Sequence, residues 1–244
     1  KRLMNDDEAY AVSKLLVSLP EKLFCHRTDG MKTLGAASYL DIKNKKSSKY
    51  YNTKDSDLNS YLHLASINNP ILFQFFEGMY KKLCSFFSEE FDVECKLHDL
   101  AAFPGFHIYD NIDKFSAQAS HIPHFDGQYE DLYSLFGEDL QILSSCSGKT
   151  LSYTMPISLP KDTSGLRVWD FHLQETLTDD KTTVKNKLSK LIPSLIKYRV
   201  GHIVYHSGHL LHQIKSWSSD INDKQRITLQ GHGILRNDCL YLYW

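Results

Sequence analysis

The spacing of hydrophobic positions divides the chain into a helical first part and a strand-rich second part. Apolar residues recur every three or four positions over residues 6 to 26, 57 to 65 and 70 to 89, which is the period of an amphipathic helix. The intervening sequence is polar, and a single short strand is predicted there over Ala37–Ile42. We therefore predict a helical N-terminal layer over residues 1–94.

Short apolar runs separated by Gly, Pro and Asp turns follow this layer. Strands of this length and spacing are typical of an antiparallel sandwich or barrel. The predicted strands are Leu100–Phe103, Gly105–Tyr109, Leu151–Leu159, Leu166–Phe171, Tyr198–Tyr205, Leu210–Trp217, Arg226–Leu235 and Cys239–Tyr243. The polar, partly helix-prone stretch Asp180–Lys197 interrupts them, and we predict an insertion over about residues 174–198 at one end of the barrel. The chain is thus expected to be a single domain over residues 1–244, with residues 95–244 as its mainly β core.

Composition narrows the class of protein further. The chain has 244 residues, of which 42% are hydrophobic, enough for a packed core. Its 28 basic and 29 acidic residues nearly cancel, so nothing indicates binding to nucleic acid or to an anionic membrane. No apolar run approaches the roughly 20 residues of a membrane span, and the first residues lack the apolar segment of a signal peptide. Five scattered cysteines without a Cys-x-x-Cys pair are typical of thiols in a reducing cytoplasm, and a cytoplasmic protein is expected.

The twelve histidines are more informative, because seven of them fall in two clusters, within residues 121–124 and within residues 202–232. His124 and Asp126 are two positions apart, so on an extended backbone both side chains point to the same face. A third ligand would complete two histidines and one carboxylate on one face of a metal ion, the arrangement that suits non-haem Fe(II). His121 lies three residues earlier and is predicted not to be a ligand.

A second histidine-rich stretch offers three candidates for the third ligand: His206, His209 and His212. His212 lies on the face of a predicted strand, whereas His209 lies at the preceding turn, so His212 is preferred and His209 is the next alternative. The following strand begins with Arg226, and Thr228 shares its face. A guanidinium group binds a carboxylate through two parallel hydrogen bonds. An anion-binding group is therefore predicted beside the metal site.

This ordered set of motifs resembles the Fe(II)- and 2-oxoglutarate-dependent dioxygenases. The resemblance covers roughly residues 95 to 235, and it rests on His124-Phe-Asp126, the run from Gly201 to His212, and Arg226-Ile-Thr228. It implies a double-stranded β-helix core, also called a jelly roll and similar to that of cupins. The strand count reached above from hydrophobic patterning agrees with this fold.

The resemblance also implies roles for single residues. His124, Asp126 and His212 would bind Fe(II), and Arg226 would pair with the distal carboxylate of 2-oxoglutarate. Either Thr228 or Tyr153 would supply a hydroxyl group that binds the same co-substrate. Decarboxylation of 2-oxoglutarate with O₂ would then be coupled to oxidation of a substrate C–H bond.

Reaction type and substrate follow from the same resemblance. Family halogenases have Gly or Ala in the position of Asp126, so the carboxylate favours hydroxylation, or a related desaturation or cyclisation. Tyr109 and Trp169 are candidates for the substrate pocket, with packing in the core as the alternative for each. A small molecule such as an amino acid or a natural-product intermediate is the expected substrate. Two alternatives stay open: the same chemistry on a protein or peptide side chain, docked on the insertion, and a metal-binding jelly roll without oxygenase activity.

Overall fold

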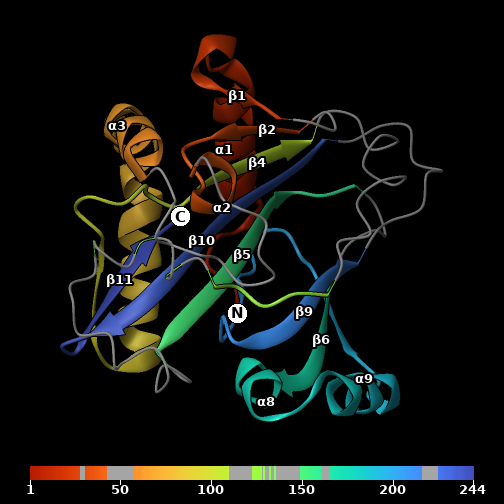
Figure 1. Cartoon of the computed structure of the whole chain (residues 1–244). Coiled ribbons are helices and arrows are strands. Elements are labelled where there is room, and N and C mark those ends of the chain that lie inside the picture. Colours follow the sequence, from red (N-terminus) through yellow and green to blue (C-terminus); the bar gives the residue numbers. More distant parts are fainter. Residues whose placement is uncertain are drawn as a thin grey trace.

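The computed structural model of the chain describes residues 1–27, 31–42, 58–109, 123–127, 129, 132, 135, 149–160, 165–215 and 225–244. Its strands form two sheets, and the longest helix crosses one face of the larger sheet (Figure 1). None of the helices described combines the length and the apolarity that crossing a lipid bilayer requires.

The larger sheet, here the major sheet, has eight strands in the described residues. They are β1 (Cys25–His26), β2 (Met31–Leu34), β3 (Glu94–Leu97), β4 (Gly105–Tyr109), β5 (Thr150–Ser158), β8 (Val204–His206), β10 (Arg226–Arg236) and β11 (Cys239–Tyr243). Strand β10 is central: β5 pairs along one edge, while β4 and β11 share the other, all antiparallel. Beyond them, β2 and β1 extend the sheet from β4, β3 runs parallel to β11, and β8 pairs with β5.

The smaller sheet, here the minor sheet, has the order β7 (Ser194–Lys197), β6 (Gly165–His172) and β9 (Leu210–Lys215). Helices α8 (Leu173–Thr178) and α9 (Lys181–Lys190) connect β6 to β7. The predicted insertion therefore contains two helices, and its last residues form a strand of the minor sheet instead of only covering one end of the barrel.

The helices are α1 (Asp6–Ser18), the short 3₁₀ helix η1 (Glu21–Leu23), α2 (Ser38–Asp41) and α3 (Leu58–Phe91) in the first part of the chain. Helix α1 starts with a capping box, in which Asn5 and Glu8 each accept the other's backbone N–H through a side-chain oxygen. Helix α3 joins the two helices predicted before and after Pro70, and its one non-helical residue is Phe76. The N-terminal layer is not only helical, because β1 and β2 join the major sheet.

Two predicted strands are wrong, and a third, Tyr198–Tyr205, is confined to β8 (Val204–His206). Ala37–Ile42 contains helix α2, because the Asp41 carboxylate accepts the Ala37 N–H at 2.8 Å and closes a helical turn. Leu100–Phe103 is not a strand either, and β3 pairs with β11 instead. The Ala102 N–H donates to the Tyr61 hydroxyl, which ties this segment to α3 instead of to a strand.

The two faces of the major sheet carry different residues. On one face, here the helix face, alternate residues of β4, β5 and β10 pack with α1 and α3 in one hydrophobic cluster. Its sheet members include Phe106, Ile108, Leu151, Tyr153, Met155, Ile157, Ile227 and Leu229. On the other face, here the inner face, the intervening positions are mostly polar: His107, Tyr109, Ser152, Thr154, Arg226, Thr228, Gln230 and His232. The inner face is where a binding site can form without exposing the core.

Candidate metal centre

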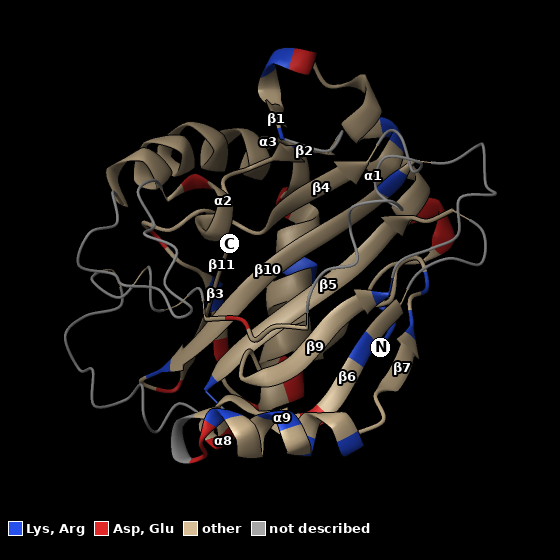
Figure 2. Ribbon diagram, turned by 45° about the vertical axis from the view of Figure 1, so that its right-hand side comes forward, with Lys and Arg blue, Asp and Glu red and all other residues tan. Residues whose placement is uncertain are grey.

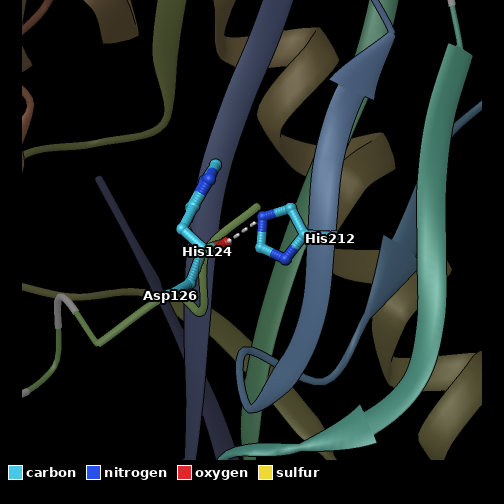
Figure 3. Close-up of side chains that lie close together, drawn as sticks. All are labelled: His124, Asp126 and His212. Atoms are coloured by element: carbon cyan, nitrogen blue, oxygen red, sulfur yellow. Dashed lines mark ion pairs between the residues drawn. The ribbon is translucent and has the colours of Figure 1, made fainter. Parts of the chain in front are cut away.

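The three predicted metal ligands converge. One ligand atom from each of His124, Asp126 and His212 lies within 4.8 Å of the other two. The Asp126 carboxylate is 3.4 Å from Nε2 of His212 and 3.8 Å from Nε2 of His124 (Figure 3). Two imidazoles and one carboxylate at this separation can hold one divalent ion and leave its other positions open.

Backbone pairing brings the ligands together from distant parts of the chain. The N–H of His124 donates to the carbonyl of His212 at 2.9 Å, and the reverse bond is 3.0 Å long. Asp126 is also held by a backbone hydrogen bond, because its N–H donates to the Gly208 carbonyl at 2.8 Å. The segment with the His-x-Asp motif therefore extends the minor sheet beside β9, where the alternation of an extended backbone turns both side chains to one side.

The protonation states also suit a metal ion. Nδ1 of His212 lies 2.9 Å from the Leu210 carbonyl, to which it donates, so the lone pair is on Nε2. Burial lowers the pKa of His212 to about 3, which keeps the ring neutral. Burial acts to raise the pKa of Asp126, but surrounding imidazoles, led by His212, lower it below its ordinary value. A neutral imidazole and an ionised carboxylate are the ligand forms that bind metal.

The site is open on one side. The His124 side chain is 43% exposed, whereas that of His212 is only 6% exposed. A ligand can therefore reach the three residues past His124.

The structure brings Arg226 and Thr228 to the inner face, as the alternation predicted. Both residues are fully buried. The guanidinium carbon of Arg226 lies 5.4 Å from the centroid of the Tyr109 ring, and Tyr109 is the residue paired with Arg226 across β4 and β10. A buried guanidinium is costly unless an anion accompanies it, so the donors at this position suit a carboxylate.

Tyr153 is not part of this arrangement, and its predicted role in binding 2-oxoglutarate is wrong. Its ring packs against Phe87 of α3 with centroids 5.1 Å apart, on the helix face of the major sheet. Gly231 lies beneath it, where a Cβ atom would come within 2.4 Å of the Tyr153 hydroxyl. The inner-face residues of β5 are its neighbours Ser152 and Thr154, so Tyr153 belongs to the core.

The two residues predicted for the substrate pocket, Tyr109 and Trp169, lie in different sheets. Tyr109 is buried on the inner face beside Arg226, whereas Trp169 is half-buried on β6, next to Val168, the partner of His212. His121 lies outside the described residues. His209 is not available as a ligand, because both ring nitrogens lie within 3.0 Å of other side chains.

Two further histidines lie near the predicted ligands: His206, which was a less favoured candidate for the third ligand, and His232, to which the sequence analysis gave no role. The ring of His206 lies against that of His212, tilted by 51° with centroids 4.3 Å apart, and His232 bonds through Nδ1 to the Ser152 hydroxyl at 3.1 Å. Both act electrostatically on Asp126. His232 could have been found, because it continues the alternation of Arg226 and Thr228 along β10.

No protein-family model and no curated protein matches the chain. Among solved structures, an N-substituted L-amino acid dioxygenase from Burkholderia ambifaria AMMD superposes with a TM-score of 0.50 at 13% identity, covering 97% of this chain and 91% of that chain. The chain has the fold of this dioxygenase. The predicted jelly-roll core is therefore confirmed.

Other solved structures are similar at lower scores. The same Burkholderia ambifaria dioxygenase in complex with alpha-KG has a TM-score of 0.48 at 14% identity, covering 88% of this chain and 86% of that chain. The non-heme alpha ketoglutarate dependent epimerase SnoN from nogalamycin biosynthesis has a TM-score of 0.45 at 12% identity, covering 96% of this chain and 78% of that chain.

Proposed function

We propose that the chain is an Fe(II)- and 2-oxoglutarate-dependent oxygenase that acts on a C–H bond of a small molecule. The observation that carries the proposal is the convergence of His124, Asp126 and His212 within 4.8 Å on a jelly-roll scaffold. This donor set fits Fe(II), since two imidazoles and a carboxylate would occupy one face of the ion. When bound, the iron would supply the activation of O₂ that the side chains cannot provide.

The remaining residues would bind and orient the reactants. The buried Arg226 guanidinium would hold the distal carboxylate of 2-oxoglutarate, and the Thr228 hydroxyl, also fully buried, would donate to the same group. Tyr109 would border this region, because it is paired with Arg226. Trp169, on the strand next to β9, stays a prediction for the substrate pocket. The exposed side of His124 would be the entrance.

Hydroxylation is the reaction we favour, with desaturation or cyclisation as related outcomes. Asp126 supports this choice, because its carboxylate would occupy the coordination position that a halide needs in halogenation. The fold of an N-substituted L-amino acid dioxygenase makes amino acids and their N-substituted derivatives the first compounds to screen.

The direct experiment is an assay of succinate formation with Fe(II), O₂ and 2-oxoglutarate. We expect succinate to form in the wild type and to fall at least about 1,000-fold in Asp126→Ala, because a ligand is lost. The matched control is Asp170→Ala, an exposed acidic residue on β6. Undiminished turnover in Asp126→Ala would refute the ligand assignment. Failure of the wild type to bind 2-oxoglutarate would favour a metal-binding jelly roll without oxygenase activity.

A peptide or protein substrate is the second candidate, and one feature favours it. All four residues of β7 are exposed, and Ile192 just before it is 91% exposed. Lysines of α9 and basic residues of the minor sheet lie close to this edge (Figure 2). An apolar edge strand flanked by positive charge can bind an extended acidic peptide by strand addition. Comparing 2-oxoglutarate turnover with free amino acids and with acidic peptides would distinguish the two candidates.

A further inference from the structure

The turn between β8 and β9 joins the metal centre to the insertion. Within it, His209 is 1% exposed. Its Nε2 lies 2.7 Å from the Tyr129 hydroxyl, and its Nδ1 lies 3.0 Å from the side-chain nitrogen of Gln174. Tyr129 follows the His-x-Asp motif in the chain, and Gln174 belongs to α8. These three residues, here the His209 clamp, therefore connect three separate segments.

The chemistry of the partners defines the form of the ring. An amide nitrogen only donates, so Nδ1 of His209 accepts from Gln174. The neutral ring then carries its hydrogen on Nε2 and donates it to the Tyr129 oxygen. Burial, followed by the nearby His172, lowers the pKa of His209, in agreement with a neutral ring. Both nitrogens are thus used to hold neighbouring segments.

The backbone of the same turn holds a metal ligand. The Gly208 carbonyl accepts the N–H of Asp126 at 2.8 Å, and the His209 carbonyl accepts the N–H of Leu173 at 2.9 Å. The contact at Gly208 is close, because a Cβ atom there would lie 3.0 Å from the Asp126 carbonyl oxygen. A displacement of this turn would therefore displace Asp126.

We propose that the His209 clamp positions Asp126 for metal binding and couples the placement of α8 to the metal centre. The inference rests on the metal site of the proposed function. His209, Tyr129 and Gln174 are positioning residues in this account, since they act on the metal only through the turn at Gly208. Outer partners of metal ligands typically change metal affinity by about 10- to 100-fold when they are removed.

The test is isothermal titration of the full chain with Mn(II), a stand-in for Fe(II) that resists oxidation by air. We expect His209→Phe, which keeps a ring and removes both nitrogens, to weaken Mn(II) binding by about 10-fold or more. Tyr129→Phe and Gln174→Leu each remove one contact, and each should weaken binding by about 3- to 10-fold, the equivalent of one hydrogen bond. Tyr129→Phe combined with His209→Phe should weaken it little more than His209→Phe alone, because Tyr129 acts through His209.

Tyr205→Phe is the matched control. Its hydroxyl also makes a side-chain hydrogen bond, to Glu90, but its ring packs against Phe86 and Phe87 of α3 on the helix face. We expect it to change the melting temperature and not the Mn(II) affinity. Equal Mn(II) affinity in Tyr129→Phe and the wild type, or an equal loss in Tyr205→Phe, would overturn the inference. The milder Tyr129→Phe keeps the test decisive if His209→Phe does not fold. A wild type that does not bind Mn(II) would refute the proposed function itself.

Discussion

The two faces of the major sheet differ more in chemistry than in burial. On the helix face, Phe87 and Tyr153 pack among hydrophobic residues. Substitutions there are expected to change the free energy of unfolding. On the inner face, Arg226 and Thr228 are fully buried as well, yet polar and charged groups at such depth are costly for folding. A strand such as β10 supplies both faces, alternating residue by residue. Burial alone therefore does not separate core from site, whereas the chemistry of each face does.

The largest effect on stability is expected on the helix face. Phe87→Ala should lower the free energy of unfolding by about 3–5 kcal/mol, because it leaves a cavity between rings including Tyr153 and Tyr205. Chemical denaturation would measure the loss, and the folded fraction should bind Mn(II) as the wild type does. Phe73→Ala is the control, since Phe73 lies on the same helix but is 41% exposed. Equal losses in the two variants would contradict the packing described for α3.

The next largest effect is expected on the inner face, on the affinity for 2-oxoglutarate. Arg226→Leu should weaken 2-oxoglutarate binding by about 100-fold or more, because a charged, bidentate partner of the carboxylate is lost. The free energy of unfolding should fall little or even rise, since a buried charge is replaced by an apolar side chain. Calorimetric titration and thermal unfolding would measure the two quantities separately. A large loss of stability with unchanged binding would place Arg226 in the structural core instead.

A smaller effect is expected for Thr228→Val, which removes one hydroxyl and nearly preserves shape. Binding of 2-oxoglutarate should weaken by about 3- to 10-fold, equivalent to about 1 kcal/mol for one hydrogen bond. Titration calorimetry on the Mn(II)-loaded protein would detect it. Thr182→Val, on the first turn of α9, is the control and should bind as the wild type does.

The smallest effect is expected for Tyr153→Phe. Within the described residues the Tyr153 hydroxyl is buried without a hydrogen-bond partner, so its removal should be neutral or slightly stabilising. Neither 2-oxoglutarate affinity nor turnover should change. A marked loss of co-substrate affinity in this variant would restore the role first predicted for Tyr153.

Local patterning was sufficient to predict much of the fold and the convergence of His124, Asp126 and His212. Two-residue alternation identified both the His124–Asp126 pair and the Arg226–Thr228 pair, because each pair lies on extended backbone. The same rule, applied further, would have excluded Tyr153, which shares its parity with the apolar Leu151, Met155 and Ile157. Tyr153 carries a hydroxyl group, as Thr228 does, but it lies on the opposite face of the sheet.

Other features have no local signal in the sequence. Tyr129 and His209 are 80 residues apart and meet only because the turn and the ligand segment pair through their backbones. Helix α2 also depends on tertiary contacts, since Asp41 both closes its turn and binds the guanidinium group of Arg27 at 2.7 Å. Contacts of this kind follow from the assembled sheet and not from the spacing of nearby residues.

One binding measurement tests most directly whether the inner face is the functional one. It is calorimetric titration of the Mn(II)-loaded protein with 2-oxoglutarate, in the wild type, Arg226→Leu and Tyr153→Phe. We predict saturable binding in the wild type and in Tyr153→Phe, with a loss of about 100-fold or more in Arg226→Leu. No saturable binding in the wild type, or equal affinities in the wild type and Arg226→Leu, would contradict the assignment of this face to the co-substrate.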